Sequence, residues 1–153
     1  MSEFMSYMSE ALAEAKAAGA RNEVPVGAVV VSPGGIVIGR GGNETRALND
    51  PTAHAEILAI RRACVEIGSE RLIGCSLWVT LEPCPMCAAV IGFARIKRLY
   101  FGASDEKSGG VDHGPRIFQS TSAHHVPEIY RGASEDQCAV LLRDFFEKKR
   151  SVS

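Results

Sequence analysis

Four side chains that could carry out metal and proton chemistry lie in two short stretches of the sequence. His54 and Glu56 stand in "DPTAHAEI", and Cys84 and Cys87 stand in "EPCPMC". In the second stretch Cys84 occupies an expected helix N-cap and Pro85 suits the first helical position, so the unpaired N–H groups of the helix end favour thiolates. Two thiolates and one imidazole make a Cys2His ligand set, which in catalytic zinc sites leaves a fourth tetrahedral position for water. The two stretches therefore predict a catalytic zinc centre.

The spacing of His54 and Glu56 is unusual for two residues that act together. On a regular helix, residues two apart point about 200° away from each other. We expect a helix with Asp50 as its N-cap and Pro51 just inside, and at such a tip both side chains can point along the axis toward one target. His54 would bind the metal and Glu56 would stand beside the water. Because zinc with two thiolates carries about no net charge, it acidifies water weakly, and a carboxylate must accept the proton and hand it on.

Three other interpretations of these residues stay open at this point. Cys84 and Cys87 could form a thioredoxin-like dithiol, although this leaves His54 and Glu56 without a role. A fourth ligand could close the site and make it structural, and the candidates are the remaining histidines, His113, His124 and His125. The protein could also be a non-catalytic, zinc-stabilised RNA-binding module. The carboxylate of Glu56 argues against that module, because a structural site has no use for an unligated acid beside the metal.

Length, charge and cysteine content limit the class of protein. The 153 residues suffice for a single domain, 1–153, with one core. A formal charge of −1 gives no support to nucleic-acid binding by overall charge, so such a partner would need a local basic patch. Five cysteines without a secretory signal favour metal chemistry over a disulfide framework. The longest apolar run, residues 85–94, is far shorter than the ~18–20 residues that cross a bilayer. We expect a cytoplasmic protein with no membrane partner.

Hydrophobic patterning predicts a three-layer α/β domain around a mixed central sheet. An S-x-x-Q capping box from Ser134 to Gln137 is expected to open the last helix. The expected elements, in order, are a helix over about 2–18 with Met5, Met8, Leu12 and Ala15 on its apolar stripe, strands 24–31 and 36–41 joined by a turn at 32–35, the helix that carries His54, strand 76–81, a helix to about 93, strand 95–102, a strand near 126–130 and the C-terminal helix.

Beyond these local patterns, the chain resembles a known family of enzymes. H-x-E followed by P-C-x-x-C is the signature of zinc-dependent nucleobase deaminases. Residues 5–150 are similar to the bacterial tRNA-specific adenosine deaminases, which convert the wobble adenosine of an arginine tRNA to inosine. The stretches that carry the resemblance are "EVPVGAVVV", "GGN", "NDPTAHAEILAIR", "LWVTLEPCPMC", "ARIKRLYFGASDEKSGG" and "LLRDFFEKKR". The resemblance implies a cytidine-deaminase-like α/β/α sandwich, one zinc ion per chain, a homodimer, and the anticodon arm of tRNA as partner.

The resemblance also implies roles for individual residues. Zinc is held by His54, Cys84 and Cys87, and Glu56 moves the proton. The implied substrate contacts are Asn43 to the flipped base, Val26 and the backbone around Ala55 and Glu82 along the pocket, Asp105 and Lys107 to neighbouring nucleotides, and Phe145 with Lys148, Lys149 and Arg150 to the anticodon arm. Without the resemblance, Asn43 could be a turn residue, and the basic end could complement the helix dipole. The closest functional rival is a deaminase of a free base or nucleoside, such as guanine or cytosine, which shares the metal chemistry.

Overall fold

The protein is built around one five-stranded mixed sheet. The structure, a computed structural model, describes residues 6–152. Its elements are α1 (Met8–Ala20), β1 (Gly27–Val31), β2 (Val37–Gly42), α2 (Ala55–Ile67), β3 (Ser76–Leu81), α3 (Pro85–Phe93), β4 (Arg98–Ala103), the 3-10 turn η1 (Ile117–Gln119), β5 (Glu128–Arg131) and α4 (Glu135–Val152). The strand order is β2-β1-β3-β4-β5.

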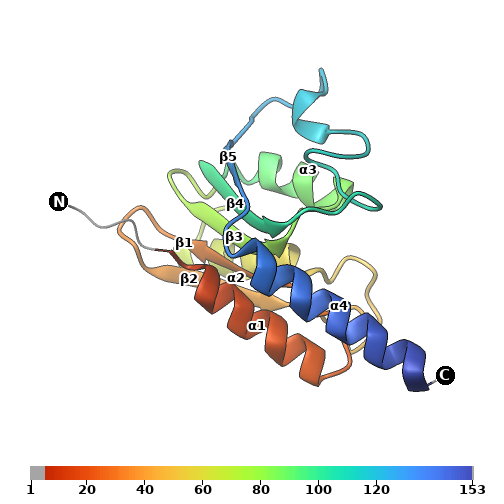
Figure 1. The fold of residues 1–153 in the computed structure, drawn as a ribbon. Helices are drawn as coiled ribbons and strands as arrows, with labels where there is room; N and C mark the ends of the chain where they lie inside the picture. The colour runs from red at the N-terminus through yellow and green to blue at the C-terminus, as the bar shows by residue number, and fades with distance from the viewer. Residues whose placement is uncertain (1–5, 153) are drawn as a thin grey trace.

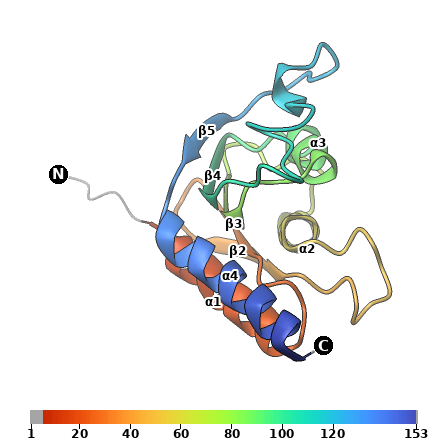
Figure 2. The same cartoon turned by 45° about the vertical axis from the view of Figure 1, so that its right-hand side comes forward.

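Helices cover the sheet in two layers, one on each face. α1 and α4 lie side by side on one face, and α2 and α3 cover the other (Figure 1, Figure 2). Because side chains alternate along a strand, β1 sends Val29 and Val31 into the core beneath α1 and sends Ala28 and Val30 into the core beneath α2 and α3. The predicted three-layer α/β/α fold with a mixed central sheet is confirmed.

The strand directions bring two helix beginnings to one edge of the sheet. β1 is antiparallel to both β2 and β3, so β2 and β3 run in the same direction. α2 follows β2 and α3 follows β3, so the N-termini of both helices start from the edge where these strands end. β4 is parallel to β3 and β5 is parallel to β4. In open α/β sheets this carboxyl edge is where ligands bind.

Two predicted boundaries differ from the structure near the N-terminus. The first helix begins at Met8, whose N–H donates to the hydroxyl of Ser6 at 3.3 Å, and not near residue 2. The predicted stripe residue Met5 lies outside the described residues. β1 begins at Gly27 instead of residue 24, because the N–H of Val26 donates to the carbonyl oxygen of Val24 at 2.8 Å in a tight turn.

The helix that carries Glu56 begins later than predicted. Asp50 is not its N-cap: the Oδ1 atom of Asp50 accepts the N–H of Thr52 at 2.9 Å and the Thr52 hydroxyl at 2.7 Å, which closes a local turn. His54 is the N-cap of α2 instead. At the last helix, Ser134 precedes α4 as predicted, but its φ of 54° lies in the left-handed region and differs from the extended backbone of an ordinary N-cap.

The close approach of α2 to β2 gives a stability prediction. A Cβ atom at Gly39 of β2 would meet the carbonyl oxygen of Ala59 and would lie 2.8 Å from the backbone nitrogen of Ala63. Gly39→Ala is therefore expected to lower the free energy of unfolding by about 1–3 kcal/mol, the usual cost of overpacking. Urea unfolding of the zinc-loaded protein measures it. The control is Gly34→Ala, since only the Ser32 hydroxyl lies near that position, at 3.8 Å. Equal stability of the two variants would contradict the prediction.

Candidate active site

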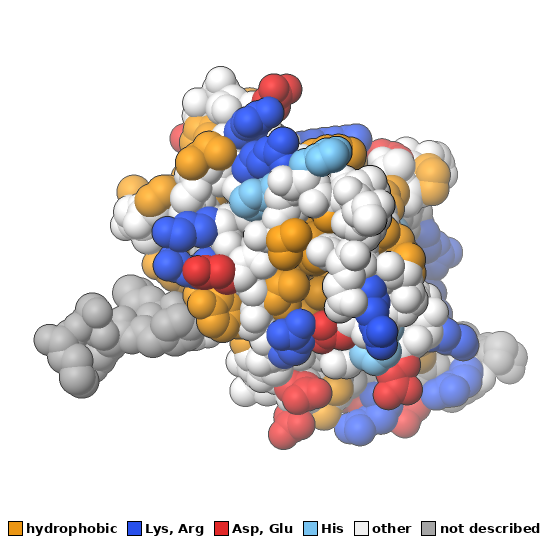
Figure 3. Space-filling view, turned by 90° about the horizontal axis from the view of Figure 1, so that it is seen from above, with side chains coloured by type: hydrophobic (Ala, Val, Ile, Leu, Met, Phe, Trp, Pro, Cys, Tyr) orange, Lys and Arg blue, Asp and Glu red, His pale blue; other side chains and the backbone are white. Residues whose placement is uncertain are grey.

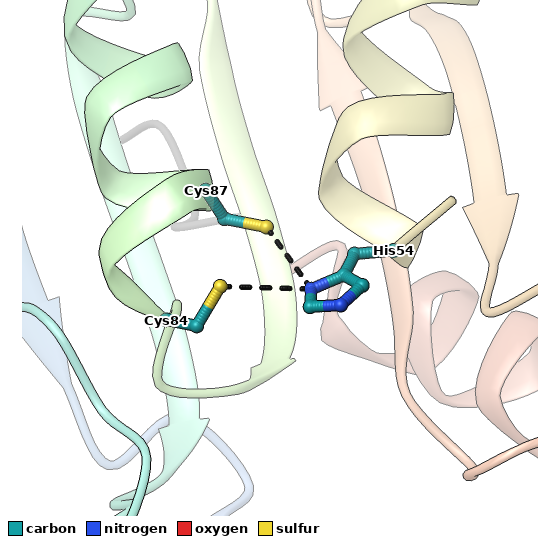
Figure 4. Close-up of side chains that lie close together, drawn as sticks. All are labelled: His54, Cys84 and Cys87. Atoms are coloured by element: carbon teal, nitrogen blue, oxygen red, sulfur yellow. Dashed lines mark hydrogen bonds between the residues drawn. The ribbon is translucent and has the colours of Figure 1, made fainter. Parts of the chain in front are cut away.

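Three potential metal ligands converge from the beginnings of α2 and α3. Cys84 is the N-cap of α3, with extended backbone (φ −69°, ψ 171°) and Pro85 as the first helical residue. His54 is the N-cap of α2, also with extended backbone (φ −74°, ψ 153°). The side chains of His54, Cys84 and Cys87 point toward one another (Figure 4). The His54 Nδ1 atom lies 3.6 Å from the Cys84 sulfur and 3.4 Å from the Cys87 sulfur.

The separations between these atoms fit a tetrahedral zinc ion. With Zn–N near 2.0–2.1 Å and Zn–S near 2.3 Å, tetrahedral angles place nitrogen and sulfur about 3.5–3.6 Å apart. The donor atoms of His54, Cys84 and Cys87 all lie within 4.8 Å of one another. Within residues 6–152 no fourth His, Cys, Asp or Glu side chain joins this group. The site could therefore hold zinc and leave one coordination position open.

The protons of the three groups are already arranged for metal binding. The hydrogen bond from Cys87, together with the bond to His54, lowers the pKa of Cys84 to about 4. The same Cys84 thiolate and burial raise the pKa of Cys87, so the pair holds one proton in the absence of metal. The bond to Cys84 raises the pKa of His54, although burial opposes it. A bound cation would replace the remaining protons and recover three anionic or neutral donors.

Glu56 is a buried acid two residues after His54. Glu56 is 4% exposed, and this burial raises the pKa of its carboxyl group to about 7. A carboxyl group with such a pKa can take up and release a proton near neutral pH, which is the property that a general acid–base catalyst needs. Because His54 is an N-cap residue, its side chain does not follow helical spacing, and the two residues can serve one site although they stand two apart.

The predicted base-binding residues lie at the tip of α2. The Asn43 side-chain oxygen accepts the N–H of Ala55 at 2.9 Å, and the Asn43 N–H donates to the carbonyl oxygen of Val26 at 3.2 Å. Val26 and Ala55 are almost fully buried. The oxygen of Asn43 is thus occupied by the first N–H of α2, which orients the side chain and leaves its NH2 group as a donor.

The predicted nucleotide contacts line a groove between α4 and the loop after β4. The groove has a volume of about 1040 Å³, and Asp105 and Lys107 form one wall of it. From α4 it is lined by Phe146, which is 47% exposed, and not by Phe145. Phe145 packs edge-on against Phe146 with ring centres 5.4 Å apart, and the Lys149 ammonium lies 5.2 Å from the Phe145 ring centre. Asp105 and Lys107 therefore lie at the groove as predicted, but the aromatic residue of α4 that lines it is Phe146 and not Phe145.

Buried carboxylates that fix the loops around the site escaped the sequence analysis. Glu23, 2% exposed, accepts the N–H groups of Arg46 and Ala47 and the Thr45 hydroxyl, which shapes the loop between β2 and α2. Burial raises the pKa of Glu23, but these hydrogen bonds outweigh it and lower the pKa overall. The only sequence signal is the position of this acid directly before the apolar segment 24–31. Its partners, more than twenty positions away, could not be read from the sequence.

Glu82 also does more than the sequence analysis assigned to it. Its backbone was expected near the pocket, but its side chain is buried and accepts hydrogen bonds from the loop after β4, including one from the His113 ring. Burial raises the pKa of Glu82, and the bonds from Asp105, His113 and Asp112 lower it by more, so the group stays ionised. His113, named above as a possible fourth metal ligand, instead contacts this carboxylate. The sequence signal is the acid itself, which directly follows the apolar run "LWVTL" and stands two residues before Cys84.

Comparisons with known proteins agree with the fold and the site. The MafB19-like deaminase family matches residues 2–150. A tRNA-specific adenosine deaminase of Agrobacterium fabrum is 56% identical over 98% of both chains. A solved structure from a study of A-to-I editing by tRNA:A34 deaminases at the wobble position of transfer RNA is 57% identical, with a TM-score of 0.87 over 89% of this chain and 98% of that one. A guanine deaminase structure from Bacillus subtilis is 28% identical, with a TM-score of 0.61 over 95% and 92% of the two chains.

A mixed five-stranded sheet with a Cys2His group where β2 and β3 end defines a deaminase of the cytidine-deaminase-like fold. Both this class and the narrower resemblance that the sequence suggested are thereby supported. The chain belongs to the family of tRNA-specific adenosine deaminases, within the MafB19-like deaminases. The predicted family membership is confirmed.

The ligand geometry predicts the metal content of the protein. We expect one zinc ion per chain in the purified protein, measured by plasma mass spectrometry. Cys87→Ala should lose this zinc, because two remaining donors do not hold the ion at ordinary concentrations. Cys64→Ala is the matched control, since Cys64 is a half-buried thiol of α2 outside the ligand group, and it should keep the ion. A full complement of zinc in Cys87→Ala would refute this ligand assignment.

Proposed function

We propose that the protein hydrolyses adenosine to inosine at the wobble position of tRNA, in particular of an arginine tRNA. The observation that carries the proposal is a buried acid, Glu56, whose side chain hydrogen-bonds to Cys87 of the Cys2His group, in a chain 56% identical to a tRNA-specific adenosine deaminase. A structural zinc site would need neither the open coordination position nor the adjacent acid with a raised pKa. These features favour a catalytic centre over a zinc-stabilised binding module and over a simple dithiol.

The chemistry divides between the metal and the side chains of this chain. His54, Cys84 and Cys87 would hold zinc, which when bound lowers the pKa of a water molecule at its open position. Glu56 takes a proton from the attacking water and delivers a proton to the amine that leaves carbon 6 of the adenine. Asn43 offers its NH2 group to the base edge, since its oxygen is bonded to Ala55. The products are inosine and ammonia.

Recognition of RNA by this chain depends on local features of its surface. The whole chain carries a formal charge of −1, so overall attraction to phosphate is absent. The groove beside α4 combines Lys107 and the basic residues Arg143, Lys149 and Arg150 with the exposed ring of Phe146. Cations that pair with phosphates and an aromatic ring that stacks on a base are the two elements of single-stranded RNA binding. An anticodon loop presents unstacked bases to such a groove at small cost.

We also propose that the protein acts as a homodimer in the cytoplasm. Hydrophobic side chains gather at the middle of the face seen from above in Figure 3, the side of the molecule where α3 and η1 lie in Figure 1. α3 and η1 line an apolar hollow of about 280 Å³ there, and the neighbouring Phe93 is 73% exposed. Exposed apolar surface of this kind favours association of two copies. No helix within residues 6–152 is long and apolar enough to cross a membrane.

The proposed substrate can be tested directly against the rival substrates. The zinc-loaded protein is incubated with an arginine-tRNA anticodon stem-loop that carries adenosine at the wobble position, and separately with guanine, cytosine and free adenosine. Ammonia and inosine are expected from the stem-loop alone, and a stem-loop with guanosine at that position is the matched control. Release of ammonia from a free base or nucleoside but not from the stem-loop would overturn the assignment to tRNA.

The role of Glu56 predicts which kinetic constant a substitution changes. Glu56→Gln keeps the size and burial of the side chain but cannot take up a proton, so kcat should fall by roughly 10²–10⁴-fold. Zinc content and the circular dichroism spectrum should stay as in the unmodified protein. Glu66→Gln, an exposed position on the same helix, is the control and should leave kcat unchanged. Full activity of Glu56→Gln would remove this residue from proton transfer.

A further inference from the structure

We propose that Glu82 and His113 are positioning residues of this enzyme, which hold the loop over residues 104–113 against the metal-ligand segment and so fix Asp105 and Lys107 for RNA binding. The inference rests on the proposed function for its substrate, and on hydrogen bonds and packing for its geometry. Neither residue touches the reacting atoms; both act through the loop.

The Glu82 carboxylate accepts hydrogen bonds from both ends of the loop. Its side chain has no exposed surface. Its Oε1 atom accepts the N–H of Asp105 at 3.0 Å, and its Oε2 atom accepts the N–H groups of Val111, Asp112 and His113 at 3.2, 2.9 and 3.2 Å. A buried carboxylate needs such donors. The two ends of the loop are therefore drawn to one buried anion.

His113 supplies the remaining bond to this anion. The His113 Nδ1 atom lies 2.8 Å from the Oε1 atom of Glu82, while the backbone N–H of His113 bonds to Oε2, so one residue grips both oxygens. The His113 side chain is 32% exposed and closes the carboxylate off from solvent. Of the two hydrogen bonds to Oε1, at 3.0 and 2.8 Å, only the one from the N–H of Asp105 remains without this ring.

The loop also packs directly on the segment that carries the first cysteine ligand. The N–H of Gly110 donates to the carbonyl oxygen of Pro83 at 2.8 Å. A Cβ atom at Gly110 would lie 2.5 Å from the nitrogen of Pro85 and 2.8 Å from the carbonyl carbon of Cys84, so only glycine allows this approach. Any shift of the loop relative to Glu82 is thus a shift relative to the metal ligands.

The far side of the loop is tied to the sheet and faces the groove. Asp112 forms a two-bond ion pair with Arg131 of β5, at 2.6 and 2.7 Å. At the other end the Asp105 side chain accepts the N–H groups of Lys107 and Ser108 at 3.2 and 2.9 Å, which shapes the turn that lines the groove. The loop therefore spans from β5 to the RNA groove, and Glu82 with His113 lies between these two anchors.

Replacement of His113 tests the proposal, because this residue lies outside the metal ligands. His113→Ala should raise KM for the wobble-adenosine stem-loop about tenfold, as expected for one lost hydrogen bond to a charged group, with a smaller change in kcat. His113→Asn places an amide N–H near the position of Nδ1 and should restore most of the KM. Thr121→Ala, an exposed position in the next loop and outside the hollow lined by α3 and η1, is the control and should match the unmodified protein.

Hydrogen exchange of the zinc-loaded variants gives a reading that does not depend on the substrate. The amides of Asp105, Val111 and Asp112 should exchange faster in His113→Ala and return toward normal in His113→Asn, with zinc content unchanged. Faster exchange together with an unchanged KM would overturn the positioning role. Unchanged exchange would do so as well, as would an Asn variant with the same defect as Ala. If the unmodified protein does not deaminate the stem-loop, the proposed function fails. The exchange data alone then decide whether Glu82 and His113 hold the loop in place.

Discussion

The site depends on one constraint. The imidazole nitrogen at the start of α2 and the two sulfurs at the start of α3 must lie within 4.8 Å of one another. The sheet meets this constraint through its strand directions, because β2 and β3 end at the same edge and each is followed by a helix. Both helices place a potential ligand, His54 or Cys84, at the N-cap, where the backbone is still extended. The side chains of His54 and Cys84 can then turn toward each other, and Cys87, in the first turn of α3, completes the group. The core beneath α2 and α3 holds this edge in place.

Three buried glutamates around this edge show how surroundings decide what a carboxyl group does. Glu23 and Glu82 each accept several backbone N–H groups, and these bonds lower their pKa despite burial. They remain anions and organise loops. Burial dominates at Glu56 and raises its pKa to about 7. The same side chain is thus held as an anion where N–H groups converge, and where burial dominates it has a pKa suited to proton transfer.

The sequence predicted the fold, and the grouping of His54, Cys84 and Cys87, because both depend on local patterns. Strand 76–81, the helix starting at Pro85 and the two segments that carry the three potential ligands follow from periodicity, capping and motif spacing. Asp50 was misread because a turn and a helix start use the same residue types, and the partner that decided it, Thr52, satisfies Asp50 locally. His113 was missed because its partner Glu82 lies 31 positions earlier. Phe145 and Phe146 are adjacent, so only the packing of α4 distinguishes which ring faces the groove.

Most donors to the Glu82 carboxylate are peptide N–H groups, which every residue except proline possesses. These bonds therefore do not depend on the side chain at a position such as Lys107, whose own N–H donates to Asp105 instead. A substitution at Lys107 would change the charge on the wall of the groove and leave the hydrogen bonds between the backbone and Glu82 in place. The surface of the groove can thus vary separately from the contacts that hold the loop against the segment of Cys84.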